Sequence, residues 1–308
     1  MTFPPLSRRR FLTGFAALAV PPPPVPPSPI AIGAGGFAYV EPPGSPYAGV
    51  TLPVYTYRPA TVPPDAARVL IVMHGADRSG ARCRNQWAAL AERYRVLVLA
   101  PEFSTRFFPG AVYDRGNVRG ADDHTEVPAE RWTFPVIERL FAHYKTMTRS
   151  LVTGYHLYGE GARASFAHRL IEFLPTARIV RAAVGGADYY TLPDKTGDPY
   201  PYSRAQTPDE SENARRAVFA CALTVLVGAA NADTPDVELP RTLEADRQGL
   251  TRGARADYFY ETARRVTERD HLFLNWDRVS VPGAEREGAL LTAAAKVLFT
   301  PKNAESAA

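Results

Sequence analysis

Residues Tyr155–Arg169 read Y-H-L-Y-G-E-G-A-R-A-S-F-A-H-R, and this stretch decides the fold. The opening residues Y-H-L-Y favour a short buried strand, Gly159 and Gly161 mark a tight turn, and a helix is expected from Ala162 onward. A strand that turns sharply into a helix holds one residue at the edge of a sheet, where it is exposed to ligands. The segment therefore predicts an α/β fold with a candidate site at this turn.

The chain on both sides of this turn alternates strands and helices. The continuous apolar runs at 69–74 and 96–100 are typical of strands that are buried on both faces. Repeated β-α units predict a mostly parallel central sheet with helices on both faces. Further strands are expected at 50–57, 179–185, 223–227 and 274–281, and helices at 86–94, 129–144, 162–174, 254–268 and 287–299. Sites in such sheets lie at the carboxyl ends of the strands.

Length and composition indicate one large domain behind an N-terminal leader. Of the 308 residues, 45% are hydrophobic and 22% are charged, which is ordinary for a globular protein. We expect a signal peptide at 1–20, a proline- and glycine-rich linker at 21–49, a single domain at 50–300 and a tail at 301–308. The net charge is only +4 and the basic residues form no stripe with interleaved aromatics, so nucleic-acid binding is not predicted.

The leader has the pattern of an export signal. The segment S-R-R-R-F-L at 7–12 opens a modest apolar run that continues to residue 20, as is typical of twin-arginine signals. This run is shorter than the roughly 20 apolar residues that a stable transmembrane helix needs, so no membrane span is predicted. The sequence therefore predicts export by the twin-arginine machinery to a periplasmic or secreted location. The alternative is a disordered basic tail.

The turn after Leu157 has the outline of a nucleophile elbow that lacks its nucleophile. The elbow pattern is G-x-S-x-G. Gly159 stands at the first glycine, Gly161 at the serine and Arg163 at the second glycine. Glycine has no side-chain atom that can attack a substrate, although it adopts the strained elbow backbone freely. The pattern therefore predicts a hydrolase scaffold without its nucleophile.

Several motifs, taken together, resemble the α/β-hydrolase superfamily, and in particular its bacterial exported esterase and polyhydroxyalkanoate-depolymerase-like branch. The resemblance covers most of 69–299 and rests on the order of V-M-H-G-A (72–76), V-L-A-P-E-F (98–103), W-T-F (132–134), L-Y-G-E-G-A-R-A-S-F-A-H-R (157–169), Y-Y-T-L-P-D (189–194) and V-S-V-P-G (279–283). The elbow of this branch reads G-H-S-A-G-A-Q-F-x-H-R. Phe166, His168 and Arg169 match its end, which places Gly161 at the serine. The resemblance implies an α/β-hydrolase fold.

The resemblance also implies that the catalytic triad is degenerate. After the strand at 223–227 the branch has a G-D-x-D-like turn, and here G-A-A-N-A-D places Asn231 at the acid, with Asp233 as a second candidate. In the V-P-G-x-x-H-like stretch, Arg286 stands at the histidine. A guanidinium stays protonated and cannot act as a base. A carboxamide carries no charge with which to stabilise an imidazolium.

The remaining site residues are predicted around the turn. Backbone N–H groups of Ala76 and Ala162 would form what is left of an oxyanion hole. The candidate pocket consists of His74, Asp77, Glu160, Arg163 and Tyr189. With Glu160, Arg163 and Arg286 where relatives have serine chemistry, the site suits a small polar or anionic ligand better than a neutral ester. Neither a metal nor a cofactor is predicted.

The leading hypothesis is an exported pseudoenzyme that binds a ligand or regulates a partner. The alternative is an active esterase or depolymerase-like hydrolase in which Ser165 or Glu160 replaces the lost serine. A third reading is a decaying paralogue with no present role, and a weaker one is a dinucleotide-binding protein, because residues 159–164 also fit G-x-G-x-x-[GA]. That fingerprint normally opens the first β-α unit, whereas this one lies in the middle of the chain. The adjacent residues Asp122, Asp123 and His124 are interpreted as a solvated loop rather than a metal site.

Overall fold

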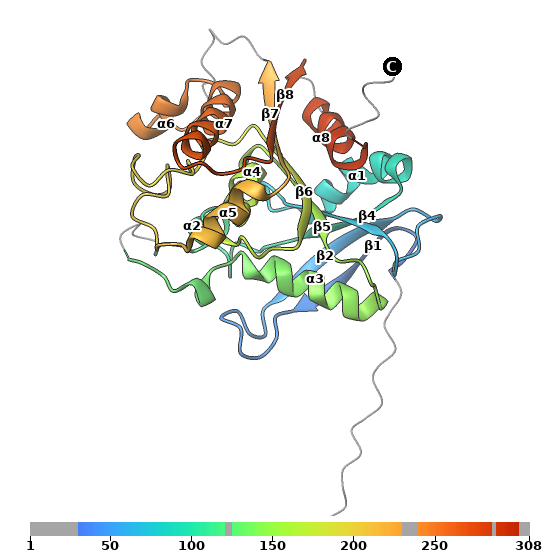
Figure 1. The fold of residues 1–308 in the computed structure, drawn as a ribbon. Coiled ribbons are helices and arrows are strands. Elements are labelled where there is room, and N and C mark those ends of the chain that lie inside the picture. The colour runs from blue at the N-terminus through green and yellow to red at the C-terminus, as the bar shows by residue number, and fades with distance from the viewer. Residues whose placement is uncertain (1–29, 121–124, 230–238, 285–287, 302–308) are drawn as a thin grey trace, which may run out of the picture.

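A computed structural model describes residues 30–120, 125–229, 239–284 and 288–301 (Figure 1). Within these ranges the strands are β1 (Gly33–Val40), β2 (Thr51–Arg58), β3 (Arg68–Val72), β4 (Val96–Pro101), β5 (Tyr155–Glu160), β6 (Ile179–Gly185), β7 (Leu223–Ala229) and β8 (Trp276–Pro282). The helices are α1 (Gly80–Tyr94), α2 (Gly110–Asp114), the 3-10 turn η1 (Ala129–Arg131), α3 (Pro135–Thr148), α4 (Ala162–Phe173), α5 (Glu212–Ala220), α6 (Leu243–Gln248), α7 (Arg252–Arg269) and α8 (Ala289–Phe299).

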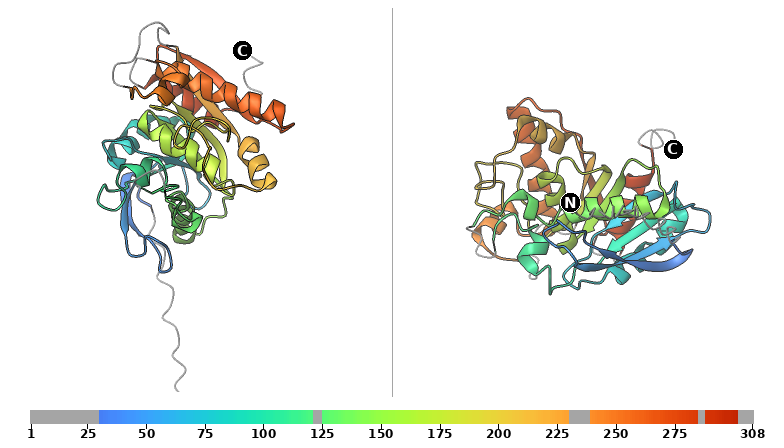
Figure 2. Two further views of the ribbon diagram at one scale, coloured as in Figure 1. Left: turned by 90° about the vertical axis from the view of Figure 1, so that its left-hand side faces the viewer. Right: turned by 90° about the horizontal axis from the view of Figure 1, so that it is seen from below.

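The strands form one eight-stranded sheet in the order β1-β2-β4-β3-β5-β6-β7-β8. The pairs β1–β2 and β2–β4 are antiparallel, and every later pair from β4–β3 to β7–β8 is parallel. The prediction of a mostly parallel sheet is therefore confirmed. The hairpin β1–β2 and strand β8 form opposite ends of the sheet, and Figure 2 shows the blue hairpin lying away from the orange and red C-terminal helices.

Helices cover both faces of the sheet, as predicted. Alternate residues of one strand enter different cores, so that Val69 and Ile71 pack with α3, α4, α5 and α7, whereas Leu70 and Val72 pack with α1 and α8. Strands that are buried on both faces read as continuous apolar runs, which explains why β3 and β4 were visible in the sequence. The result is a three-layered core with β5 in the middle of the sheet.

The ordered domain begins closer to the N-terminus than the sequence analysis expects. Strand β1 lies inside the segment 21–49, which was expected to be a linker, and Ile30 and Tyr39 are buried in the core. Behind this hairpin, Glu41 is fully buried and forms an ion pair with Arg139 of α3, with Nη2 and Oε2 2.8 Å apart. The strand was not predicted from its sequence, G-A-G-G-F-A-Y-V, because glycine has weak strand propensity.

The helix expected at 129–144 is divided in two. Residues 129–131 form η1, Trp132 is extended, and α3 then begins at Pro135. Proline is favoured in the first turn of a helix, because it lacks the N–H that has no intrahelical partner there. Helices α2, α5 and α6, which lie in the long connections between strands, were not predicted from the sequence.

The leader could not be compared with the structure. The expected signal peptide at 1–20, residues 21–29 and residues 302–308 lie outside the described part of the chain. Among the helices that are described, none has the length and apolar character needed to cross a membrane.

Candidate functional site

The site is built on the turn between β5 and α4. Gly161 precedes the first residue of α4 and has φ +60° and ψ −134°, a backbone conformation that L side chains rarely adopt. Its N–H donates to the carbonyl of Gly185 at the end of β6, over 2.9 Å. A Cβ added at Gly161 would meet no atom within 4 Å. The turn thus has the strained geometry of an elbow, and a side chain there would project into open space.

The segment after β6 and the start of α7 border this turn. At Gly186, which has φ +67°, an added Cβ would lie 3.7 Å from both the Gly161 nitrogen and Cδ of Arg252. Arg252 forms an ion pair with Asp188, with Nη2 and Oδ1 3.0 Å apart. The carbonyl of Asp188 accepts a hydrogen bond from Arg255, which is fully buried. An ion pair is therefore fixed between the segment after β6 and the start of α7, which border this turn.

A second carboxylate reaches the same edge of the sheet from α2. Burial raises the pKa of Asp114, against the opposing effect of the guanidinium groups of Arg78 and Arg169, and Asp188 raises it further. Arg78 is held in place because its Nη1 donates to the carbonyls of Phe103 (3.2 Å) and Phe108 (3.0 Å). Neither Asp114 nor Arg252 was predicted for the site, because neither belongs to a motif that signals a ligand.

His74 was predicted in the pocket, but it lies behind the turn and is fully buried. Its Nε2 accepts the N–H of Phe103 over 2.8 Å, and its Nδ1 lies 3.0 Å from the carbonyl of Gly75. The ring also stacks on Tyr113, with the centroids 4.4 Å apart. Because both ring nitrogens are engaged by backbone groups, His74 shapes the loop and offers neither nitrogen to a ligand.

Three other predicted pocket residues, Asp77, Glu160 and Tyr189, remain at least partly accessible. Asp77 forms an ion pair with Arg82 (Oδ2 to Nε, 2.9 Å). Glu160 accepts a hydrogen bond from the hydroxyl of Tyr158, which lies two residues earlier on the same strand. Tyr189 is half-buried between the ring of Tyr202, 4.9 Å away, and the guanidinium of Arg169, 5.2 Å from its ring centre. These groups make the edge of the sheet polar and aromatic.

The predicted oxyanion-hole residues lie on adjacent turns. Ala76 follows β3 and Ala162 opens α4 directly after β5. Because β3 and β5 are neighbours, the two turns leave the sheet side by side. The arrangement can therefore present backbone N–H groups to one bound group, as a helix N-terminus does for an anion.

Neither replacement nucleophile is paired with a base in the described residues. Ser165 is buried within α4. His168, the nearest histidine along that helix, uses Nδ1 on the carbonyl of Ala164 (2.7 Å) and Nε2 on the N–H of Thr191 (3.0 Å). Burial holds the pKa of His168 well below its usual range. His168 is thus a neutral core residue and cannot activate Ser165.

The other two triad positions could not be placed. Asn231, Asp233 and Arg286 lie outside the described residues, as does the side chain of Arg163. Strands β7 and β8 pair in register, with Ala229 opposite Pro282, and both end on the same edge of the sheet as Gly161. The loop at 122–124 is likewise not described. In the parts of the chain that are described, no group of three or more His, Cys, Asp or Glu side chains could hold a metal ion.

No family model matches this sequence, and no curated protein matches it either. Solved structures do match. Poly(aspartic acid) hydrolase-1 from Sphingomonas sp. KT-1 is 32% identical over 88% of this chain and 100% of its own, with a TM-score of 0.79. A poly(3-hydroxybutyrate) depolymerase from Bordetella parapertussis is 28% identical over 89% of this chain and 92% of its own, with a TM-score of 0.77.

A more distant serine hydrolase, an IroE-like protein from Shewanella oneidensis, shares the fold at 10% identity with a TM-score of 0.55, over 86% of this chain and 80% of its own. The sheet order, the elbow between β5 and α4 and these likenesses confirm the α/β-hydrolase fold that the sequence motifs implied. The chain belongs to the α/β-hydrolase superfamily, in its esterase- and depolymerase-like branch.

Proposed function

We propose that this protein is an exported member of the branch that has lost serine-hydrolase chemistry and uses the former active site to bind an anionic ligand. The observation that carries the proposal is Gly161. It occupies the strained position before α4 where the elbow of the branch has its serine, and it offers no nucleophilic atom. The serine mechanism needs a hydroxyl, a base near neutral pKa and an acid that orients the base.

The motif register supports the loss of the other two groups as well. It assigns Arg286 to the histidine and Asn231 to the acid. Arginine cannot accept a proton in the working pH range, and asparagine cannot balance the charge of an imidazolium. Backbone donors at Ala76 and Ala162 would survive these changes, because they need no side chain. What remains is a binding site for an anionic group.

The ligand class follows from the donors that remain and from the relatives. The N-terminus of α4 favours a negative charge at Gly161. Arg252, which pairs with Asp188, lies near Gly186 on the segment that borders this turn. One relative is a poly(aspartic acid) hydrolase, which supports a carboxylate-bearing oligomer as the ligand. We therefore propose short oligo-aspartate chains as the first ligand to try.

Ester and polymer hydrolysis by the full chain tests the loss of chemistry. The substrates are nitrophenyl esters of short and long acyl chains, poly(aspartic acid) and poly(3-hydroxybutyrate). The wild type is compared with a variant that carries Gly161→Ser, Asn231→Asp and Arg286→His. A matched control carries Gly161→Ala with the same two other substitutions, since alanine restores a Cβ but no hydroxyl.

We expect no hydrolysis by the wild type or by the alanine control. The serine variant should hydrolyse at least one substrate. This outcome would support both the motif register and the lost triad. Hydrolysis by the wild type would overturn the proposal, and Glu160→Gln and Ser165→Ala would then identify the displaced nucleophile. Ligand binding is measured separately by calorimetry with oligo-aspartate, with the uncharged oligo-asparagine as its control.

A further inference from the structure

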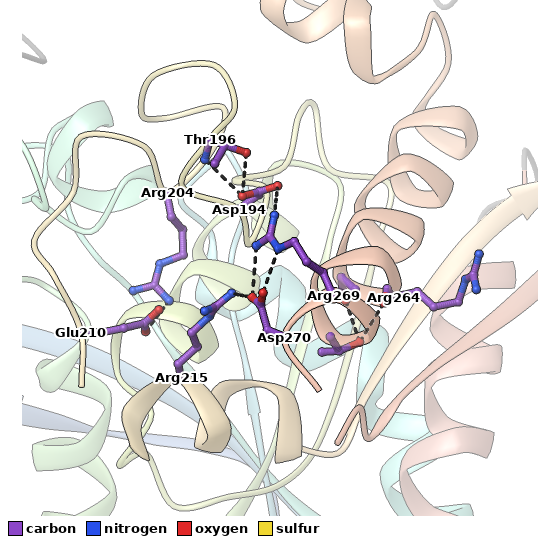
Figure 3. Close-up of polar contacts among 10 residues, drawn as sticks. Asp194, Thr196, Arg204, Glu210, Arg215, Arg264, Arg269 and Asp270 are labelled. Carbon is purple, nitrogen blue, oxygen red and sulfur yellow. Dashed lines mark hydrogen bonds and ion pairs between the residues drawn. The ribbon is translucent and has the colours of Figure 1, made fainter. Parts of the chain in front are cut away.

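The long connection between β6 and α5, residues 186–211, is held to the domain by ionic groups. Arg204 lies at its centre and is only 5% exposed. Its Nη1 forms an ion pair with Oε2 of Glu210 over 2.7 Å, and its guanidinium lies 4.9 Å from the ring centre of Phe173. Figure 3 shows Arg204 and Glu210 next to the charged groups at the ends of α5 and α7.

A cavity of about 190 Å³ opens beside Arg204. Four basic side chains and three acidic ones line it, together with Pro193 and Thr196: Lys195, Arg204, Arg215, Arg269, Asp194, Asp209 and Glu210. Arg215 and Arg269 both bind Asp270, and Arg269 also reaches Asp194 (Nη1 to Oδ2, 3.5 Å), as the dashed lines in Figure 3 show. The Arg269–Asp194 pair fastens the connection to the end of α7, and Arg215 of α5 is tied to the same place through Asp270.

A second carboxyl group lies on the inner side of Arg204. Glu172 on α4 is 1% exposed, and neither of its carboxyl oxygens has a hydrogen-bond partner among the described residues. Nε of Arg204 and Nη2 of Arg169 are likewise buried without a hydrogen-bond partner among the described residues. The positive charges of Arg204 and Arg169 favour the ionised form of Glu172, and the negative charge of Glu210 disfavours it. One guanidinium, that of Arg204, is thus shared by a rim carboxylate and a buried carboxyl group.

Arg169 and Arg204 differ in how firmly they are held. The guanidinium of Arg169 donates to Oγ1 of Thr191 (2.7 Å), to the carbonyl of Asp114 (2.7 Å) and to the carbonyl of Ser165 (3.2 Å). Among the described residues, the guanidinium of Arg204 is held by its ion pair with Glu210. Of the two cations near Glu172, Arg204 is therefore the one that can turn.

We propose that Arg204 is a proton-controlled latch: it binds Glu210 while Glu172 is protonated, and it turns inward to Glu172 when Glu172 loses its proton. A buried carboxylate without a partner is costly, so ionisation of Glu172 must draw a cation to it. Glu210 then loses its partner at the rim of the cavity. The latch loosens residues 193–210, which continue directly from Asp188 and Tyr189 at the elbow site. Opening of the latch thereby changes the site.

The chemistry of Glu172 fits this scheme. Burial is the largest influence on it and raises its pKa to about 8, while Arg204 and then Arg169 lower the pKa and Glu210 raises it. Of the charged groups that influence the pKa of Glu172, Arg169 lies on α4, and Arg204 and Glu210 lie on the connection. The carboxyl group is protonated at neutral pH and ionises in mildly alkaline solution.

Limited trypsin digestion of the full chain tests the latch, because Lys195 and Arg204 are cleavage points within 193–210. Wild type, Glu172→Gln and Glu210→Gln are digested from about pH 6 to about pH 10, and each rate is divided by that of a reference peptide at the same pH. We expect cleavage of the wild type at these two points to rise several-fold as the pH passes 8. Cleavage of Glu172→Gln should stay slow throughout, because glutamine cannot ionise. Glu210→Gln removes the rim partner and should be cleaved fast already at neutral pH.

Identical pH profiles for wild type and Glu172→Gln would overturn the latch. If Glu172→Gln does not fold, the latch is tested instead by amide hydrogen exchange of the wild type, with rates corrected for the intrinsic pH dependence of exchange. Loss of protection confined to 193–210 above pH 8 supports the latch. Protection that is unchanged, or lost equally in 193–210 and in α5, contradicts it.

Discussion

At the scale of single residues, the backbone of Gly161 matters more than its missing side chain. The residue has φ +60°, and a Cβ placed there would meet nothing within 4 Å. The obstacle to a serine is therefore conformational strain rather than lack of room. A residue with a Cβ held in such a region costs on the order of 1–3 kcal/mol.

This strain predicts the stability of two glycine variants. Gly161→Ser should lower the free energy of unfolding by about 1–3 kcal/mol, from strain alone. Gly116→Ala should lower the free energy of unfolding by more. Gly116 has a similar φ of +65°, and in addition its new Cβ would lie only 1.9 Å from Cζ of Phe134, which is a clash. Urea denaturation of both variants checks the order. An equal or smaller loss for Gly116→Ala would show that strain at Gly161 is not the only cost there.

His156 predicts a pH dependence of stability. Burial, and after it the charges of Arg68 and Arg181, lower its pKa to about 4. Between pH 4 and 6.5 the unfolded chain binds a proton at His156 that the folded chain does not bind, so stability falls as the pH falls through this window. A shift of this size corresponds to a contribution on the order of 3 kcal/mol, fully lost below pH 4.

The measurement is urea unfolding of wild type and His156→Phe at pH 7 and at about pH 4. Phenylalanine can keep the packing against Phe299, whose ring centre lies 4.8 Å away, but it cannot titrate. The variant should therefore lose less stability on acidification than the wild type. Equal losses in the two proteins would mean that other groups govern the acid response.

At the scale of elements, a buried charge cluster joins the N-terminal hairpin to α3, in addition to the pairing of β2 with β4. Glu41 accepts hydrogen bonds from the hydroxyls of Tyr39 (2.9 Å) and Ser45 (2.6 Å), and it pairs with Arg139 on α3. Removal of one partner of a buried ion pair leaves the other charge unpaired, which typically costs 3–5 kcal/mol. We expect a loss of about this size for Glu41→Gln, reduced because Arg139 is partly exposed.

Glu212→Gln is the matched control for this variant. It removes the same type of charge from an ion pair with Arg216 on α5, but that pair is exposed and is worth less than about 1 kcal/mol. Thermal unfolding of both variants compares the two pairs directly. If Glu41→Gln were no more destabilised than Glu212→Gln, the hairpin would not depend on this cluster.

The sequence predicted the elements that are buried and continuous, and it missed those that are held by distant partners. Strand β6 and helix α4 were located to within one residue, because their apolar patterns are long and regular. Strand β1 was missed because five of its eight residues are glycine or alanine and its partner lies in β2. Gly161 was recognised from local order alone, whereas Asp114 and Arg252 reach the site through tertiary contacts that no local pattern records.

At the scale of the whole molecule, the domain boundary can be tested by truncation. Removal of residues 1–29 should leave a folded protein, since the described sheet begins after them. Removal of 1–49 deletes β1 and Glu41, and it should leave a protein that is much less stable or insoluble. Circular dichroism melts of the two truncated forms check this. Equal melting of both would mean that β1 is dispensable.

The leader carries a prediction about cell biology. Replacement of Arg8, Arg9 and Arg10 by lysine should abolish export, because the twin-arginine machinery reads arginine and not positive charge alone. Fractionation of cells that express each form checks the location. Export of the lysine form would point to another route, and retention of the wild type in the cytoplasm would contradict the predicted signal.

The conformation of Gly161 also has an evolutionary consequence. Under the proposed function, loss of the serine would have relieved strain in the fold, so the mutation that abolished the nucleophile would have carried its own stabilising effect. A serine that reappeared by chance would first weaken the protein, and it would restore no chemistry until the acid and the base had returned as well. On that proposal, the conformation of Gly161 makes the path from an enzyme to a binding protein easier than the reverse path.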